Sequence, residues 1–303
     1  MASRQVCIGG VVFLLALSIA ETAFPQAWVK SRGEYFLKLY GAYLYTTQEF
    51  DSNGELQDLF EEDASKTDAS FRDISFVGYL EYGLTDNLTL VTELPFRIFT
   101  SEETVVAGPG LMRKVSRTNG GLSDLTVHLR VPILKKSLAW SVQGGIKIPL
   151  GYEKVPDNGG PALGTGELDA ELTTHAGLSL YPIPAYLSGG VGYRFRGGEF
   201  NDEILYDAEA GITLGRLFVK LRVEGVENTH NPPDVAGSTI VISPREGTIT
   251  TIVVGDQNYV KILPTLSFDL NDNAAITAEA FHTVAGNNTL AGTTYAAGLI
   301  FTR

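Results

Sequence analysis

Residues 121–133 read Gly-Leu-Ser-Asp-Leu-Thr-Val-His-Leu-Arg-Val-Pro-Ile, and their polarity alternates with a period of two. Successive side chains of an extended strand point to opposite faces of the sheet. One face of this stretch is therefore aliphatic, and the other carries the polar side chains Asp124, Thr126, His128 and Arg130. The alternation predicts a β-strand with an apolar medium on one side and a polar medium on the other.

The same alternation recurs before and after this stretch. We expect about twelve strands, over residues 33–47, 71–84, 88–99, 121–133, 138–150, 167–181, 185–195, 204–214, 217–226, 259–270, 275–284 and 295–301. Residues 100–120 and 227–258 are expected to form long connections, the second with a hairpin over residues 239–254 that extends past the main sheet. No helical period and no linker interrupts the series, which indicates one all-β domain.

Composition favours strands and turns over helices. The chain of 303 residues contains 33 Gly and only 2 Met, and 44% of its residues are hydrophobic. The formal net charge of -12 argues against nucleic acid as a partner, because proteins that bind nucleic acid present a basic surface. The single cysteine, Cys7, lies in the N-terminal apolar run and has no lipobox before it, so we expect neither a disulfide nor a lipid anchor.

The N-terminus has the features of a secretory signal peptide. Arg4 precedes an apolar run over residues 6–19, with a cleavage site after Ala20. A membrane anchor is the alternative, but the run is shorter than the roughly 18 apolar residues that a spanning helix needs. We predict a signal peptide over residues 1–20 and a barrel domain over residues 21–303, with too short a segment before the first strand for a plug.

The predicted connections alternate between short and long. Tight turns are expected at residues 85–87, 135–137, 182–184, 215–216 and 271–273, separated mostly by long hydrophilic stretches. Outer-membrane barrels show this alternation, with the short turns in the periplasm. Strands of about 10 to 14 residues suit a tilted membrane crossing, and about twelve of them enclose a lumen too wide for aliphatic side chains to fill. The apolar faces are therefore predicted to meet lipid.

The predicted fold is a single transmembrane antiparallel up-and-down β-barrel of the outer-membrane type, with short periplasmic turns, long extracellular loops and both termini in the periplasm. A soluble two-sheet sandwich is the alternative. Residues 294–301 resemble the C-terminal strand signal of bacterial outer-membrane barrels, although the chain ends on Thr302-Arg303 instead of an aromatic residue. Aromatic residues near strand ends suit interfacial girdles, namely Tyr35, Tyr45, Tyr82, Phe99, Tyr181 and Phe195.

Three short motifs resemble one known family. Residues 81–88 read Glu-Tyr-Gly-Leu-Thr-Asp-Asn-Leu, residues 121–125 read Gly-Leu-Ser-Asp-Leu, and residues 164–169 read Gly-Thr-Gly-Glu-Leu-Asp. Together with the strand spacing they resemble the barrels of the MetA-pathway of phenol degradation family, which often has Gly where Ser123 stands. The resemblance implies an outer-membrane channel for hydrophobic or aromatic compounds. It supplies no set of binding residues.

The polar faces provide the candidate pore lining. Both signs of charge occur in near balance, which argues against a dedicated anion pore. One interpretation is a salt-bridged lumen around ordered water, and the other is a narrow aqueous path whose selectivity these side chains set. The candidates are Lys38, Glu93, Arg97, Asp124, His128, Arg130, Lys147, Glu167, Asp169, Glu171, His175, Arg194, Arg196, Asp207, Glu209, Lys220, Arg222, Glu224, Lys261 and Glu279.

Other chemistry is less well supported by the residue patterns. His128 and His175 share the polar face with acids, but no His-Glu-x-x-His spacing indicates a metal, and we expect no metal, no cofactor and no catalytic residues. An outer-membrane lipid hydrolase would need a serine beside a histidine such as His282, and no recognisable pattern provides one. The acidic stretch 51–63 suits either a solvated loop or Ca²⁺, which could bridge lipopolysaccharide.

We therefore predict a passive channel in the outer membrane of a Gram-negative bacterium, for small hydrophobic or aromatic solutes. Residues 100–120 and 227–258 are the hypothetical gating loops. The alternative functions are a structural or adhesive barrel with a sealed lumen and, with less support, the lipid hydrolase. The expected partners are outer-membrane lipid and lipopolysaccharide, the small-molecule solute, and the barrel-assembly machinery through the last strand, with no nucleic acid.

Overall fold

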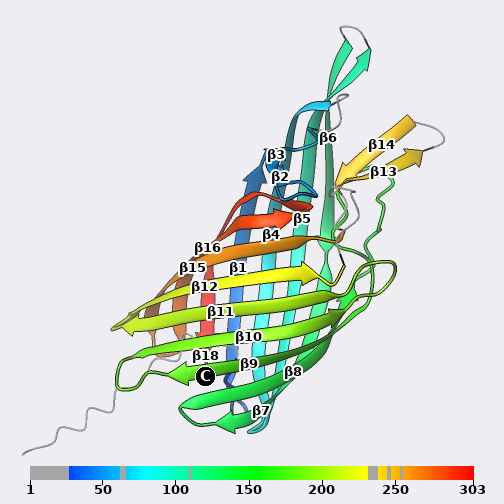
Figure 1. Ribbon diagram of the computed structural model, residues 1–303. Coiled ribbons are helices and arrows are strands. Elements are labelled where there is room, and N and C mark those ends of the chain that lie inside the picture. Colours follow the sequence, from blue (N-terminus) through cyan, green and yellow to red (C-terminus); the bar gives the residue numbers. More distant parts are fainter. Residues whose placement is uncertain (1–26, 62–65, 109–110, 231–237, 244–246, 253–254) are drawn as a thin grey trace, which may run out of the picture.

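The computed structural model describes residues 27–61, 66–108, 111–230, 238–243, 247–252 and 255–303. They form a closed antiparallel barrel of 12 strands, so the predicted all-β barrel is confirmed (Figure 1). No helix among the described residues has the length and apolarity needed to cross a membrane. The predicted signal peptide, residues 1–20, lies outside the described residues.

The barrel wall follows the order of the chain. Its strands are β1 (Tyr35–Thr46), β4 (Lys66–Thr85), β5 (Leu88–Gly108), β6 (Leu111–Leu122), β7 (Asp124–Lys135), β8 (Leu138–Pro149), β9 (Asp169–Ser179), β10 (Ala185–Phe195), β11 (Glu203–Leu214), β12 (Leu217–Asn228), β15 (Asn258–Asn271), β16 (Ala274–Asn287) and β18 (Gly292–Thr302). β6 and β7 occupy one position in the wall, because both pair with β5. β7 pairs with the first residues of β5, and β6 pairs with the rest of that strand.

Five further strands of the described residues lie outside the wall. β2 (Gln48–Phe50), β3 (Leu56–Asp58) and β17 (Thr289–Leu290) form a small separate sheet. Among the described residues, β13 (Ser238–Ser243) and β14 (Gly247–Ile252) pair with each other, which confirms the predicted hairpin over residues 239–254 in its described part.

The first and last strands close the barrel. β1 pairs with β4 on one side and with β18 on the other, where Phe36 lies opposite Thr302. The backbone groups of Tyr35 and Arg303 exchange two hydrogen bonds, each 3.1 Å long. The start of β1 and the end of β18 therefore lie side by side. They lie at the end of the barrel that carries the five predicted tight turns, and we call it the turn end. We call the other end the loop end.

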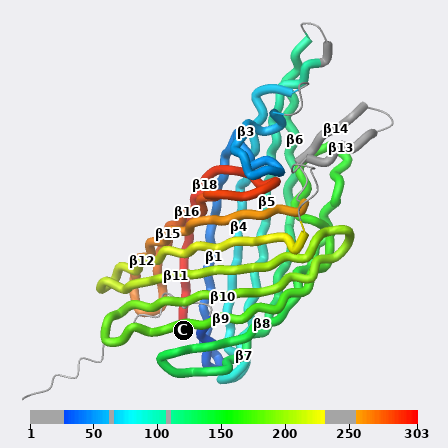
Figure 2. Tube along the Cα trace, in the orientation of Figure 1, coloured from blue at the N-terminus to red at the C-terminus, as the bar shows by residue number. Residues whose placement is uncertain are grey.

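The strands rise to different heights at the loop end. β4 and β5 have 20 and 21 residues, and β5 continues with β6 as a tall hairpin beyond the rest of the wall (Figure 2). Residues 100–108 and 111–120 are therefore strand and not part of the predicted long loop, and residues 109–110 lie outside the described residues. The prediction of a loop was wrong because the polar side chains of this stretch pair across the hairpin: Arg117 with Glu103, and Lys114 with Glu102 at 3.2 Å.

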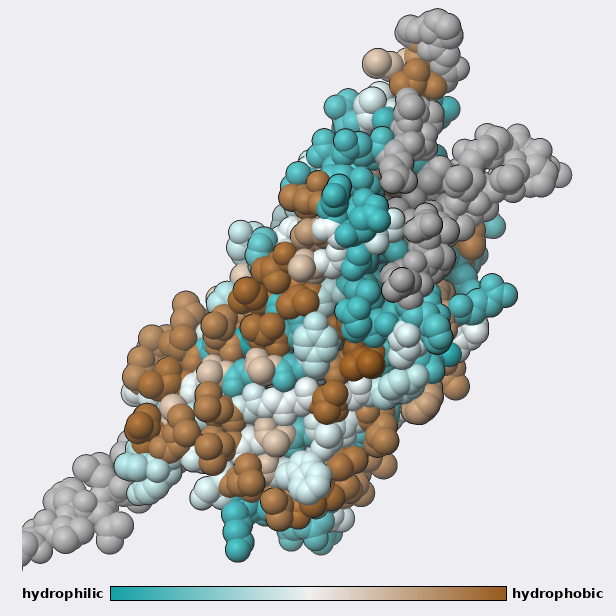
Figure 3. Space-filling model, in the orientation of Figure 1, coloured by the Kyte–Doolittle hydropathy of each residue, from teal (hydrophilic) through white to brown (hydrophobic). Residues whose placement is uncertain are grey.

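The distribution of polarity is inverted relative to a soluble protein. Arg130, Lys30 and Glu81 are among the largest completely buried side chains, whereas Leu172 and Leu266 are more than half exposed, at 55% and 53%. Apolar side chains gather over the strand-built wall, and hydrophilic ones cover much of the extension at the loop end (Figure 3). Aliphatic faces that look outward exclude the soluble sandwich, because its core would have to be made from them.

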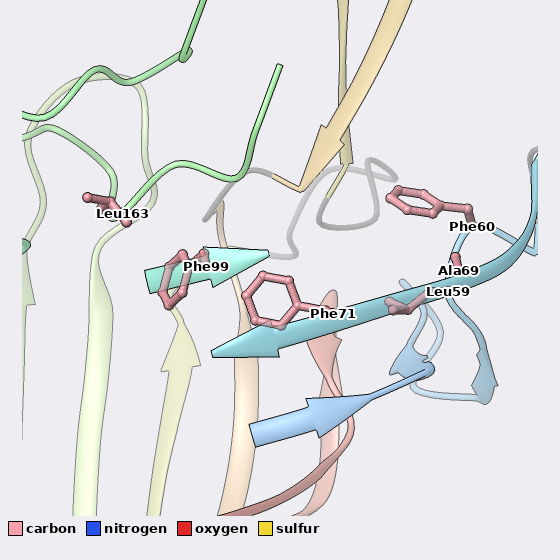
Figure 4. Close-up of a cluster of buried hydrophobic side chains, with 6 residues drawn as sticks. All are labelled: Leu59, Phe60, Ala69, Phe71, Phe99 and Leu163. Atoms are coloured by element: carbon pink, nitrogen blue, oxygen red, sulfur yellow. The ribbon is translucent and has the colours of Figure 1, made fainter. Parts of the chain in front are cut away.

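A compact apolar cluster lies at the loop end. It contains Leu59, Phe60, Ala69, Phe71, Phe99 and Leu163. Figure 4 shows the rings of Phe71 and Phe99 facing each other from adjacent strands, with centroids 5.3 Å apart. Leu163 comes from the Gly- and Pro-rich connection between β8 and β9, so that connection folds inward and narrows the mouth.

Candidate channel lumen

Inward side chains of the described residues line a central cavity and an outer cavity in the lumen. The central cavity, toward the turn end, has a volume of about 600 Å³ and is lined by inward side chains from all around the wall. The outer cavity, toward the loop end, has a volume of about 310 Å³. Tyr40, Arg97 and Phe281 line both and therefore mark the boundary between them. A solute that moves along the barrel axis must pass these three side chains.

Most of the candidate pore residues face the central cavity. Within each strand they are spaced by two residues or a multiple of two, so their side chains all point inward. The structure places around this cavity Lys38, Glu93, Arg97, His128, Arg130, Glu171, His175, Arg194, Asp207, Glu209, Lys220, Arg222, Glu224 and Glu279. Lys261 lines the outer cavity.

The remaining candidates lie close to the loop end. Lys147 Nζ is 2.7 Å from a carboxylate oxygen of Asp169 and 3.5 Å from one of Asp124. Arg196 pairs at 2.9 Å with both Glu203 and Asp256. These charges neutralise each other inside the wall instead of lining the central cavity.

Glu167 departs from the prediction. The predicted strand begins at Glu167, but β9 begins at Asp169, and Glu167 forms an ion pair with Lys154 in the preceding connection. Gly166 has a φ of 69°, a left-handed conformation that turns the chain just before the strand. Glu167 is therefore a side chain of the outer connection and not of the pore wall.

Ion pairs tie the lumen charges together across strands. Lys38 and Glu279 approach to 2.6 Å, and Arg130 Nη1 lies 3.1 Å from Glu81. Arg194 donates to Glu171 at 3.1 Å. Buried charges are stable when they are paired and hydrogen-bonded, so this network fixes the shape of the lumen.

The histidines lie in two different settings. His128 Nε2 is 3.6 Å from Glu171, and His175 Nδ1 is 3.8 Å from Asp207, both within the lumen. No group of three potential metal ligands occurs among the described residues. His282 is exposed on the outer wall, where its ring nitrogen and the Thr293 hydroxyl share a hydrogen bond of 2.9 Å.

Sequence reasoning missed the aromatic part of the lining. Tyr40, Tyr79, Tyr186 and Tyr259 line the central cavity beside the charges. Their spacing along the strands could have identified them. Tyr40 lies two residues from Lys38 and Tyr79 lies two residues from Glu81, so each tyrosine shares the inward face of a charged residue. Phe99 was expected in an interfacial girdle, but it shares the parity of Arg97, and its side chain is buried in the apolar cluster at the loop end.

The segment before β1 enters the lumen at the turn end. The Trp28 carbonyl accepts a hydrogen bond from Arg130 at 3.2 Å, and the amide of Lys30 donates to Thr89 Oγ1 at 2.9 Å. A Cβ at Gly177 would lie 2.1 Å from the Trp28 ring, so the ring occupies the space that this glycine leaves. The segment was expected to be too short for a plug, and its described residues contact the inner face of the wall through these few groups.

The connection between β2 and β3 forms a turn that is held by an acidic residue. The Asp51 carboxylate accepts hydrogen bonds from the amides of Glu55 at 2.7 Å and Asn53 at 2.9 Å. These bonds lower the pKa of Asp51. The described part of the predicted acidic stretch is thus used to hold a turn, and residues 62 and 63 lie outside the described residues.

Comparisons with known proteins bear on the fold. No family model and no curated protein sequence matches the chain. A crystal structure of the COG4313 outer membrane channel from Pseudomonas putida F1 has a TM-score of 0.62 at 12% sequence identity, over 93% of this chain and 100% of that chain. The fold is that of an outer-membrane β-barrel.

Other solved structures are less similar. The KdgM porin has a TM-score of 0.44 at 10% identity, over 88% of this chain and 98% of that chain. The transport unit of the autotransporter AIDA-I from Escherichia coli has a TM-score of 0.46 at 8% identity, over 90% and 91%. The resemblance to the MetA-pathway family is not confirmed, because no family model matches.

Proposed function

We propose that this protein is a passive outer-membrane channel for small solutes that are apolar or aromatic. The observation that carries the proposal is the central cavity of about 600 Å³ inside a closed barrel whose exposed face is aliphatic. Such a barrel is stable in lipid, and its polar interior gives a solute a route that avoids the hydrocarbon.

Aromatic side chains support this solute class. The cavity lining alternates charged groups with rings, among them Phe36, Tyr186, Phe218 and Phe281. Ion pairs neutralise most of the charged side chains in the lumen. The lining that remains available for contact with a solute therefore consists largely of aromatic rings. Rings pack on such faces by offset stacking and edge contacts.

A pair of adjacent substitutions in β15 tests the channel. Thr265 lines the central cavity, whereas Leu266 points outward and is 53% exposed. In proteoliposomes, Thr265→Trp should lower the uptake of benzyl alcohol and phenol severalfold, and Leu266→Trp should leave it unchanged. Equal uptake by both variants and by the unaltered protein would contradict passage through the lumen.

A sealed structural or adhesive barrel is the second candidate. It is favoured by the N-terminal segment at one end of the lumen and the apolar cluster at the other, and by Leu111 and Met112 near the tip of the tall hairpin, which are 67% and 70% exposed. It predicts no uptake of any solute above that of empty liposomes. In either function the barrel contacts outer-membrane lipid and lipopolysaccharide, and β18 is the strand that the barrel-assembly machinery would engage.

A further inference from the structure

The outer cavity joins an apolar wall to two cationic side chains. Phe71 and Phe99 line it with their rings, and Leu290 packs against the same cluster. Arg97 from β5 and Lys261 from β15 line the cavity as well. An amphipathic pocket of about 310 Å³ is at the small end of the range of about 300–1,000 Å³ that is typical of ligand pockets.

The two cations differ from the other lumen cations in their partners. Lys38 and Arg130 each pair with a carboxylate. Within the part of the chain that the structure describes, neither Arg97 nor Lys261 forms an ion pair, and the buried Nε of Arg97 has no hydrogen-bond partner. A buried donor without an acceptor is costly, so an acceptor on a ligand would be stabilised here.

The carboxylates of this cavity do not supply that acceptor. Asp73 faces both cations without forming an ion pair with either, and it accepts a hydrogen bond from Ser75 at 2.5 Å. Glu49 accepts hydrogen bonds from Gln57 and from the Phe60 amide, both 3.4 Å long. Glu93 also faces Arg97 and Glu224 faces Lys261, but neither of them forms an ion pair with these cations among the described residues. An anion in the outer cavity can therefore contact both Arg97 and Lys261.

We propose that the outer cavity captures a small aromatic carboxylate, with its ring against Phe71 and Phe99 and its carboxylate between Arg97 and Lys261. The guanidinium carbon of Arg97 lies 5.6 Å from the centroid of the Phe99 ring, so a carboxylate joined directly to a ring beside Phe99 is within its reach. Arginine binds carboxylates through parallel hydrogen bonds. This inference rests on the proposed channel function and names the solute class within it.

Calorimetric titration of the full barrel in detergent tests the site with three probes. Benzoate should bind about tenfold more tightly than benzamide, which keeps the ring and loses the charge. Acetate, which keeps the charge and loses the ring, should bind more weakly than benzoate by a similar factor. Equal affinities for benzoate and benzamide, or for benzoate and acetate, would overturn the proposal.

Variants locate the binding. Arg97→Gln and Lys261→Gln should each remove most of the preference for benzoate over benzamide, whereas Arg97→Lys and Lys261→Arg should retain part of it. Lys114→Gln is the matched control, because Lys114 lies on the tall hairpin and its side chain is 72% exposed. Retention of the full preference by both Gln variants, with heat-modifiable electrophoretic mobility showing folded barrels, would refute the assignment.

Uptake measurements separate this inference from the channel function. If benzoate binds as described but no solute enters proteoliposomes, the channel function fails and the capture site stands. If phenol enters and benzoate shows no preference over benzamide, the capture site fails and the channel stands.

Discussion

At the residue scale, Arg130 shows how the lumen is held. Its side chain is 1% exposed, and it donates hydrogen bonds to Gln143 at 3.0 Å, to Glu81 at 3.1 Å and to the Trp28 carbonyl. One guanidinium therefore joins three strands and the N-terminal segment. Its removal would leave a buried carboxylate without a counter-charge, which is more costly than replacing the whole pair.

We predict that Arg130→Met lowers the free energy of unfolding by about 3 kcal/mol, because Glu81 is left buried and unpaired. Unfolding in urea from lipid vesicles measures the change. The double variant Arg130→Met with Glu81→Met should recover much of the loss, since it buries no unpaired charge. A double variant no more stable than the single one would show that the ion pair is not the cause.

Asp51 gives a prediction about pH. Because its pKa is lowered in the folded protein, the carboxylate contributes stability to its turn above its ordinary pKa, about 3.9, and loses that contribution as the pH falls through the lower folded value. Hydrogen exchange at the Glu55 amide should therefore accelerate, relative to intrinsic exchange, below about pH 4. In Asp51→Asn the protection should be lower at neutral pH and should not change over this interval, and an unchanged profile would contradict the assignment.

At the element scale, the N-terminal segment is held against the inner face of the wall at the turn end. It reaches the lumen because the wall provides space for it at particular glycines, and Gly177 accommodates the Trp28 ring. Trp28 also meets Tyr186 edge-on, with ring centroids 6.2 Å apart. Contacts of this kind tie a segment of a few residues to the wall without any strand pairing.

Gly177→Ala should displace Trp28, because its Cβ would lie 2.1 Å from the ring, and the conductance in planar bilayers should rise as the turn end widens. Gly41→Ala is the matched control, since its Cβ would meet Phe76 only at 3.8 Å, an ordinary contact. Deletion of residues 27–31 should raise the conductance at least as much. A conductance that neither change affects would show that the restriction lies elsewhere.

At the scale of the whole molecule, the barrel is stable only where its aliphatic face meets lipid. The outward residues of β9 and its approach, Leu168, Leu172 and Leu178, are 58%, 55% and 41% exposed, and the inward residues between them are polar. A charge on this outward face must be moved into hydrocarbon, at a cost that depends on depth.

We predict that Leu172→Arg destabilises the folded barrel in vesicles by about 2–4 kcal/mol and that Leu168→Arg costs about 0–1 kcal/mol, because Leu168 lies beyond the loop end of β9. Equilibrium unfolding from vesicles compares the two. Equal costs at the two positions would mean that the outward face does not cross hydrocarbon along β9.

The sequence by itself determined the all-β class, the number of barrel strands, the tight turns and the inward face of most of the candidate pore residues. A period of two and a turn such as residues 271–273 are local properties, and each can be recognised without knowing its neighbours. The alternation of polar and apolar residues also predicted that Lys38, Glu93 and Arg130 point inward, without knowledge of their ion-pair partners.

Only the tertiary structure decided which residues contact each other across the lumen and at the loop end. The pairing of Lys38 with Glu279 joins residues 241 positions apart. The polar residues 100–108 and 111–120 are paired strands, and Arg117 forms an ion pair with Glu103 across them. The entry of Trp28 into the lumen depends on a glycine in β9. These outcomes depend on strand register and on the space left inside a closed sheet, and neither is encoded in any one segment of the chain.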